Sequence, residues 1–230
     1  MLGESRIESV YRDYADDETR QRRYSFHDPA NLQRNHSVER EIQSALHIAG
    51  LTDLRGCHIL EVGCGTGYWL RECLKWGAKP EHVAGIDLLP NKIEIAKTLC
   101  PPHMRLDCGN ATTLPHDSRS MDLVMTFAVF SCVLEVRMRE AMAGEIRRVL
   151  KPGGHLLWYD LIINNPWNPH VIGISKRQLL SLFPGCSMRL KRITFAPPLA
   201  RLLAPYSTGL CSAIETLRIF NTSYLGIIQT

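Results

Sequence analysis

The sequence predicts an α/β protein built on a doubly wound, seven-stranded sheet that is mostly parallel, with the last strand antiparallel. Three observations predict it. Apolar runs of strand length alternate with helical stretches, the arrangement of a sheet covered on both faces. A glycine-rich turn follows the first apolar run and opens a helix. An acidic residue then ends the second run, about twenty residues beyond the glycines.

The elements follow one another regularly after residue 37. Strands are expected at 58–62, 83–86, 105–106, 121–126, 155–162, 188–195 and 224–228. Helices are expected between the N-cap Ser37 and Gly50, and at 68–76, 90–98, 138–150 and 176–183. The run Lys151-Pro-Gly-Gly154 is expected to break the chain between the fourth helical stretch and the fifth strand.

The length of 230 residues suits one domain with one core. Residues 1–34 carry charges of both signs and no sustained period, so they are expected to form an N-terminal arm or lid before a domain at 35–230. Residues 196–223 form an insertion in which two short amphipathic helices fit. That insertion is a lid, a dimer face or a membrane-leaning patch, and the lid is favoured because it leaves the active-site edge of the sheet.

Composition excludes several classes. Hydrophobic residues make up 45% of the chain and charged residues 22%, and no apolar run approaches the roughly 20 residues of a membrane span. The charged start lacks a signal core, and the eight cysteines form no C-x2-C pair, which favours a reducing cytoplasm and no metal. A net charge of +4 in short basic clusters does not predict nucleic-acid binding. The sequence leaves open whether the protein forms a homodimer.

The glycine turn reads Glu61-Val-Gly63-Cys-Gly65-Thr-Gly67. Glycines let the backbone approach a ligand closely, and the helix start directs amide groups toward it. The G-x-G-x-G spacing differs from the G-x-G-x-x-G of dinucleotide sites, which disfavours a dehydrogenase. Asp87, at the end of the second strand, could accept both hydroxyls of a ribose or cap the following helix, and the binding role is favoured.

These segments resemble the successive motifs of class I S-adenosylmethionine (SAM)-dependent methyltransferases over about residues 36–163. The further motifs are Leu114-Pro115, Met121-Asp-Leu-Val and Glu145-Ile-Arg-Arg-Val-Leu-Lys-Pro-Gly-Gly154. The resemblance implies a Rossmann-like fold with SAM as cofactor. It places the methionine moiety at Glu61, Gly63, Gly65 and Gly67, the ribose at Asp87, and further cofactor contacts at Leu88, Asn110, Ala111 and Phe127. Asn110 departs from the acid that relatives usually carry beside the adenine, but its amide oxygen can still accept a hydrogen bond.

The acceptor should meet the cofactor at the carboxyl ends of the strands. Relatives often carry a histidine after the fourth strand, where this chain has Phe127-Ala-Val-Phe-Ser-Cys132. A general base is therefore expected elsewhere, with His170 first, then Asp160 and His27; Asp160 could equally be a satisfied acid at a strand end. An Asn-Pro-Trp run at 165–167 superficially resembles base methylases, but it follows the fifth strand rather than the fourth.

The resemblance favours methyl transfer to a hydroxyl of a glycan or specialised metabolite. Transfer to the nitrogen of a small amine or peptide is the alternative within enzymes. A non-catalytic SAM-binding partner subunit is the alternative of a different class, since a binding fold does not prove turnover.

Overall fold

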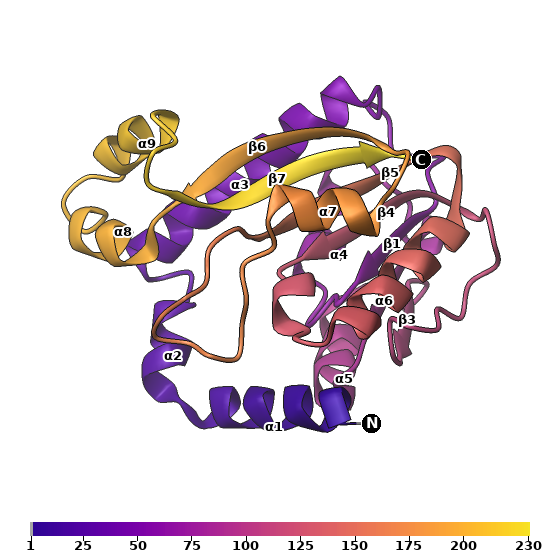
Figure 1. The fold of residues 1–230 in the computed structure, drawn as a ribbon, viewed down its shortest axis with the longest axis horizontal. Helices are drawn as coiled ribbons and strands as arrows, with labels where there is room; N and C mark the ends of the chain where they lie inside the picture. The colour runs from indigo at the N-terminus through magenta and orange to yellow at the C-terminus, as the bar shows by residue number, and fades with distance from the viewer. Residues whose placement is uncertain (1) are drawn as a thin grey trace.

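A seven-stranded sheet with the order β3-β2-β1-β4-β5-β7-β6 forms the centre of the protein (Figure 1). The computed structural model describes residues 2–230. The strands are β1 Ile59–Val62, β2 Val83–Asp87, β3 Arg105–Cys108, β4 Met121–Phe127, β5 Leu150–Leu161, β6 Ser187–Phe195 and β7 Asn221–Gln229. β7 runs antiparallel to both neighbours and the remaining pairs are parallel, which confirms the predicted fold class.

Helices cover both faces of this sheet (Figure 1). They are α1 Leu2–Asp16, α2 Glu18–Arg23, α3 Pro29–Ile48, α4 Tyr68–Lys75, α5 Pro90–Leu99, α6 Val136–Val149, α7 Lys176–Leu182, α8 Pro197–Leu203 and α9 Thr208–Thr216, with short 3₁₀ turns at Pro80–His82 and Phe130–Cys132. Within residues 2–230, no helix combines the length and the apolar character that crossing a membrane requires.

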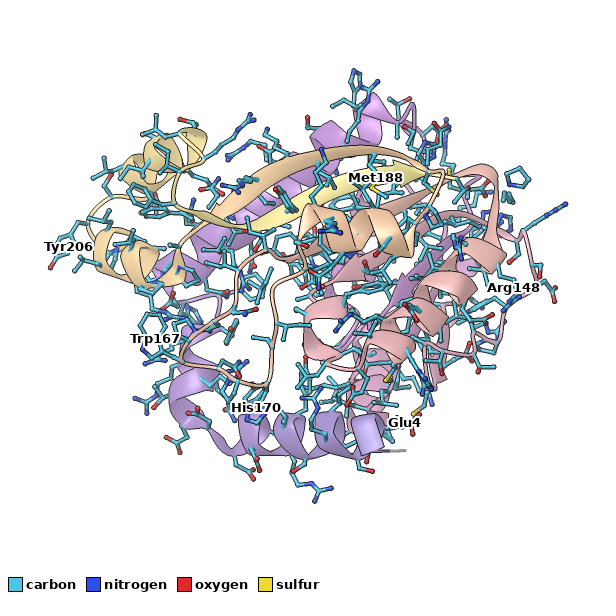
Figure 2. The ribbon with its side chains drawn as sticks, viewed as in Figure 1. Glu4, Arg148, Trp167, His170, Met188 and Tyr206 are labelled. Atoms are coloured by element: carbon cyan, nitrogen blue, oxygen red, sulfur yellow. The ribbon has the colours of Figure 1, made fainter. Side chains whose placement is uncertain are left out.

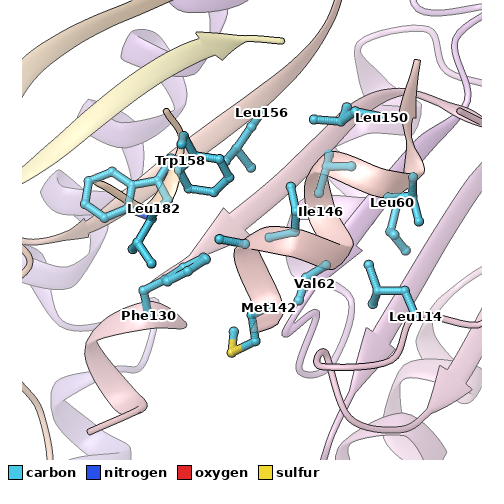
Figure 3. Packing of buried hydrophobic residues seen from close by; sticks show 14 of the residues in the cluster. Leu60, Val62, Leu114, Phe130, Met142, Ile146, Leu150, Leu156, Trp158 and Leu182 are labelled. Carbon is cyan, nitrogen blue, oxygen red and sulfur yellow. The ribbon is translucent and has the colours of Figure 1, made fainter. Parts of the chain in front are cut away.

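Alternation along the strands divides the core into two layers. Leu60 of β1 packs with α6 and α7, whereas its neighbour Ile59 packs with α3, α4 and α5. Successive side chains of a strand point to opposite faces, so each strand supplies both layers. Figure 3 shows the first layer, in which Trp158 and Phe130 lie among aliphatic side chains and are fully buried.

The helix expected after Ser37 begins nine residues earlier than predicted. α3 starts at Pro29, and the carboxylate of the N-cap Asp28 accepts a hydrogen bond of 2.8 Å from the amide of Asn31. An Asx cap followed by proline is a strong start signal. Sequence analysis missed it because polar residues on the buried side of the first turns hide the apolar period; Asn31, Gln33 and Asn35 are all buried.

The helix expected to stop at Lys151-Pro-Gly-Gly154 does end directly before it, at Val149, but the strand expected from His155 begins earlier than predicted. β5 begins at Leu150, directly after α6, and runs through this segment. The backbone of Thr230 pairs in both directions with Gly153 and Gly154, and the Lys151 ammonium binds both carboxylate oxygens of Asp122 at 2.8 and 2.7 Å. These partners come from distant parts of the chain, so local breaker residues gave no sign of them.

The N-terminal arm is helical. α1 covers residues 2–16, and Asp17 caps α2 by accepting from the amide of Arg20 at 2.9 Å. The two short helices expected in the insertion are confirmed as α8 and α9.

A buried carboxylate joins three elements beside the insertion. Glu215 of α9 accepts from Gln33 and Ser37 of α3, at 2.9 and 2.8 Å, and from the backbone amide of Thr194 in β6 at 2.7 Å. Ser37, expected to begin a helix, therefore lies inside one and anchors α9. Buried donors of this kind are costly to leave without an acceptor.

Glu215→Ala should lower the free energy of unfolding by about 3 kcal/mol, because three buried donors lose their acceptor. Denaturant titration measures this loss. Glu18→Ala, which removes a carboxylate whose side chain is 83% exposed, is the matched control and should change stability by less than about 0.5 kcal/mol. Equal effects of the two substitutions would contradict this role for Glu215.

Candidate active site

The glycine turn after β1 holds a backbone that only glycine adopts readily. Gly63, Gly65 and Gly67 have φ values of 74°, 53° and 74°. A side chain on Gly63 would come within 2.4 Å of Val129, whereas nothing lies within 4 Å of the position that a side chain on Gly65 would take. Gly65 also lines a cavity. The turn thus packs against β4's loop on one side and opens to the cavity on the other.

Asp87 ends β2 at the wall of the same cavity. Its carboxylate accepts from the amide of Gly65 at 2.8 Å and from the amide of Leu89 at 2.9 Å. Leu89, rather than Asp87, occupies the N-cap position of α5. Burial raises the pKa of Asp87, and the two backbone amides oppose that rise. One carboxylate therefore orients the glycine turn and faces the cavity.

Glu61 lies in β1, directly before the glycine turn, and is not part of the cavity wall. It is 2% exposed, and among residues 2–230 its Oε2 atom has no hydrogen-bond partner. Burial, with a smaller contribution from the nearby Asp87, raises the pKa of Glu61 well above its ordinary value. A buried oxygen without a partner is a site where a ligand's donor would be stabilised.

Asn110 and Ala111 line the cavity beyond the end of β3. The Asn110 amide oxygen accepts from the amide of Thr112 at 2.8 Å, and its side-chain nitrogen donates to the carboxylate of Glu4 in α1. The amide oxygen keeps capacity for a second bond. Glu4 places a carboxylate beside the position where the resemblance implied an acid.

Helix α1 forms one wall of the cavity through Ile7 and Tyr11. The Tyr11 hydroxyl lies 3.6 Å from the Cys132 sulfur, and burial raises the pKa of Tyr11. Farther along α1, Tyr14 exchanges hydrogen bonds of 3.1 and 2.9 Å with Asn168 in the loop after β5. The cavity enclosed in this way measures about 160 Å³.

The walls of the cavity are mainly apolar. Its polar side chains belong to Tyr11, Asp87, Lys92, Asn110 and Cys132. Phe127, at the end of β4, forms part of the wall and stacks on Trp69 of α4 with ring centroids 4.9 Å apart. An apolar cavity with a few convergent polar groups is the usual form of a small-molecule site.

Residues 59–154 match the family model described as a methyltransferase domain. The match covers the glycine turn, Asp87, the wall at Asn110 and the end of β4. Residues 59–154 therefore form a domain of the class I SAM-dependent methyltransferase family.

Solved methyltransferases share the fold of this chain. A SAM-dependent methyltransferase from Mesorhizobium loti superposes with a TM-score of 0.59 at 16% identity, covering 81% of this chain and 96% of that one. A putative sarcosine dimethylglycine methyltransferase from Galdieria sulphuraria gives a TM-score of 0.63 at 14% identity, covering 84% of each chain. Identities this low show the fold alone.

Curated relatives act on varied acceptors. A sterol 4-C-methyltransferase of Caenorhabditis elegans is 30% identical over 53% of this chain and 36% of its own length. A phthiotriol/phenolphthiotriol dimycocerosates methyltransferase of Mycobacterium leprae is 34% identical over 49% and 41%, and an arsenite methyltransferase of Mus musculus is 30% identical over 54% and 37%. The chain spans less than half the length of each of these relatives.

SAM is the cofactor of this family, and the residues present fit it. Gly65 presents an open backbone to the cavity, Asp87 faces it with a carboxylate, and Glu61 holds an oxygen without a partner behind the turn. Of the expected cofactor residues, Gly63, Gly65, Asp87, Leu88, Asn110, Ala111 and Phe127 line the cavity. Glu61 and Gly67 lie behind it, where Gly67 packs closely on Cys100.

The three candidate bases lie outside the cavity wall. Asp160 is fully buried near the end of β5, where its two oxygens accept from the amides of Ser131 and Leu161 at 3.0 and 2.9 Å; burial raises its pKa to about 6. His27 is exposed between α2 and α3. His170 is exposed on the loop after β5, the loop that Asn168 joins to α1 (Figure 2).

Sequence reasoning missed Glu4, Ile7 and Tyr11. They line or border the cavity only because α1 folds back across the edge of the sheet. The aromatic residues of the arm were the one sign of such a role, and they did not show which helix face would turn inward.

Asp87→Ala should weaken SAM binding by about 1.5 to 3 kcal/mol, because a charged acceptor facing the cavity is lost. Calorimetric titration measures the affinity, with Glu94→Ala, an exposed carboxylate on α5, as the matched control and NAD as the ligand that should give no binding heat. In the wild type, affinity should also fall as the pH drops through the raised pKa of Asp87, since the protonated carboxyl loses acceptor strength. Unchanged affinity in Asp87→Ala would assign Asp87 a purely structural role.

Proposed function

We propose that this protein transfers a methyl group from SAM to a hydroxyl of a small, largely apolar metabolite. The observation that carries the proposal is the glycine turn and Asp87 facing one mainly apolar cavity. A glycan acceptor receives less support, since a sugar presents many hydroxyls and the wall offers few polar side chains. The relatives named for sterol and phthiotriol methylation support the apolar character of the acceptor, although the sterol relative is named for transfer to carbon.

The residues of the chain supply alignment and exclusion of water. When bound, SAM supplies a methyl group whose bond to a sulfonium sulfur is open to in-line displacement by an acceptor. Asp87 and the glycine turn hold one end of the site, and Phe127, backed by Trp69, forms a rigid apolar wall. A fixed, dry geometry lowers the barrier by removing the entropy and solvent costs of encounter.

Residues 1–34 act as the lid of this site in our proposal. The cavity under α1, about 160 Å³, is smaller than the roughly 300–1,000 Å³ of typical small-molecule sites. Ile7 and Tyr11 therefore have to withdraw for ligands to enter. Lid motions of this kind seal a site from water once the ligands are bound.

Methyl transfer is tested by incubating the protein with methyl-labelled SAM and small-molecule extracts of the source organism. Mass spectrometry of the labelled products should find the label on the hydroxyl oxygen of an apolar compound. SAM binding is measured in parallel. Binding without any labelled product would support the partner-subunit alternative, and a label on nitrogen would overturn the choice of a hydroxyl.

His170 is the first candidate for the base that takes the hydroxyl proton. A neutral imidazole can accept a proton at a ring nitrogen, and the loop of His170 borders the lid through Asn168 and Tyr14. His170→Ala should lower turnover by roughly a hundredfold to ten-thousandfold and leave SAM affinity nearly intact. His103→Ala, which removes a histidine from the α5–β3 connection, is the control. Near-normal turnover in His170→Ala would exclude the role and direct attention to Asp160 or His27.

A further inference from the structure

The α8–α9 insertion presents large apolar side chains to solvent. We define its outer face as Leu199, Leu202, Tyr206, Leu210, Leu217, Ile219 and Phe220. Tyr206 is 88% exposed, Ile219 is 72% exposed and Leu202 is 64% exposed. Figure 2 shows Tyr206 pointing away from the rest of the molecule. Single exposed apolar residues are ordinary, but a run of seven in one insertion marks an interaction surface.

The inner face of the same helices is built from small residues. Ala200, Ala204 and Cys211 are buried and pack against Ala30 and Phe195. Leu203 and Ile214 are partly buried beside this cluster, and the other large apolar side chains of the two helices are exposed. This arrangement loses hydrophobic stabilisation in water unless the outer face has an apolar partner.

The exposed charged side chains of the insertion are all positive. Residues 197–220 contain three charged side chains, Arg201, Glu215 and Arg218. Glu215 is buried and accepts three hydrogen bonds, whereas both arginines are exposed. The solvent-facing surface thus combines large apolar side chains with positive charge.

We propose that the outer face of the insertion binds the surface of a bilayer containing anionic phospholipids. Leucine, isoleucine and phenylalanine side chains enter the boundary of the acyl chains, and tyrosine prefers the headgroup level. The two arginines meet the negative surface potential of anionic lipids. A second copy of the same face fits less well, since the contact would gather four arginines and no exposed carboxylate of the insertion.

The position of the insertion gives this contact a use. β6 is antiparallel to β7, as β5 is, so β6 and β5 end at the same edge of the sheet. α8 follows the end of β6 at that edge, where β1, β2 and β4 also reach the cavity (Figure 1). Membrane contact brings the edge that carries the cavity close to the bilayer. The contact itself rests on the insertion alone and does not require the proposed methyl transfer.

The test is co-sedimentation of the full chain with two kinds of vesicle, one of equal parts phosphatidylglycerol and phosphatidylcholine and one of phosphatidylcholine alone. The protein should bind the anionic vesicles at least about tenfold more strongly, and added salt should weaken that binding. The combined variant Leu202→Ser, Tyr206→Ser and Ile219→Ser should lose at least about tenfold in partitioning.

Matched controls separate the contribution of the outer face to vesicle binding from the general effect of removing apolar or charged side chains. Ile95→Ser, Leu99→Ser and Leu180→Ser remove apolar side chains that are 44%, 51% and 45% exposed elsewhere, and should leave vesicle binding unchanged. Arg201→Ser with Arg218→Ser should weaken binding to anionic vesicles, whereas Arg177→Ser with Arg189→Ser should not. SAM titration of every variant verifies that it is folded.

Three results would overturn the proposal. The first is wild-type protein that stays in the supernatant with anionic vesicles, and the second is equal binding to both kinds of vesicle. The third is a dimer in light scattering that the patch variant dissociates, with no vesicle binding, which would make a second copy the occupant.

Discussion

The hydrogen bond between the Asp87 carboxylate and the Gly65 amide connects the two parts of the cofactor site. Gly65 belongs to the turn after β1, and Asp87 ends the neighbouring strand β2. The turn needs left-handed backbone at three glycines, which a free loop would not hold in one arrangement. Parallel pairing of β1 with β2 brings the carboxylate to the amide, so the sheet itself sets the shape of the site.

Keeping acids at this edge of the sheet opposes the stability of the fold. Burial raises the pKa of Glu61, Asp87 and Asp160, so each carboxylate is harder to ionise in the folded protein than in water. Asp160 offsets its burial with two backbone amides, whereas Glu61 keeps an oxygen without a partner. Such costs persist where a ligand or a reaction makes use of them. The contrast favours Glu61 as part of the binding machinery and Asp160 as a satisfied structural acid.

Local patterns predicted the parts of the protein that local chemistry determines. The strands from β1 to β7, the glycine turn and the strand-end position of Asp87 follow from apolar period, glycine spacing and strand order. The start of α3, the extension of β5 through Pro152 and the fold of α1 do not. The cap that begins α3 is local, but the polar side chains that follow it include Gln33 and Ser37, which are buried against the distant Glu215. β5 depends on Thr230, and α1 depends on Asn110 and Cys132, all far along the chain. The sequence of the charged arm did not show which face of α1 turns inward, because only a few of its residues contact the site.

The central claim is that the glycine turn and Asp87 bind SAM beneath an N-terminal helix that closes over it. Amide hydrogen exchange with and without SAM tests this most directly, since it reports the opening of each segment separately. The account predicts slower exchange on SAM binding both at residues 63–67 and along α1, with α7, which contributes no residue to the cavity wall, unchanged. Protection at the glycine turn with unaltered exchange in α1 would contradict closure, and unaltered exchange in both would contradict the cofactor site itself.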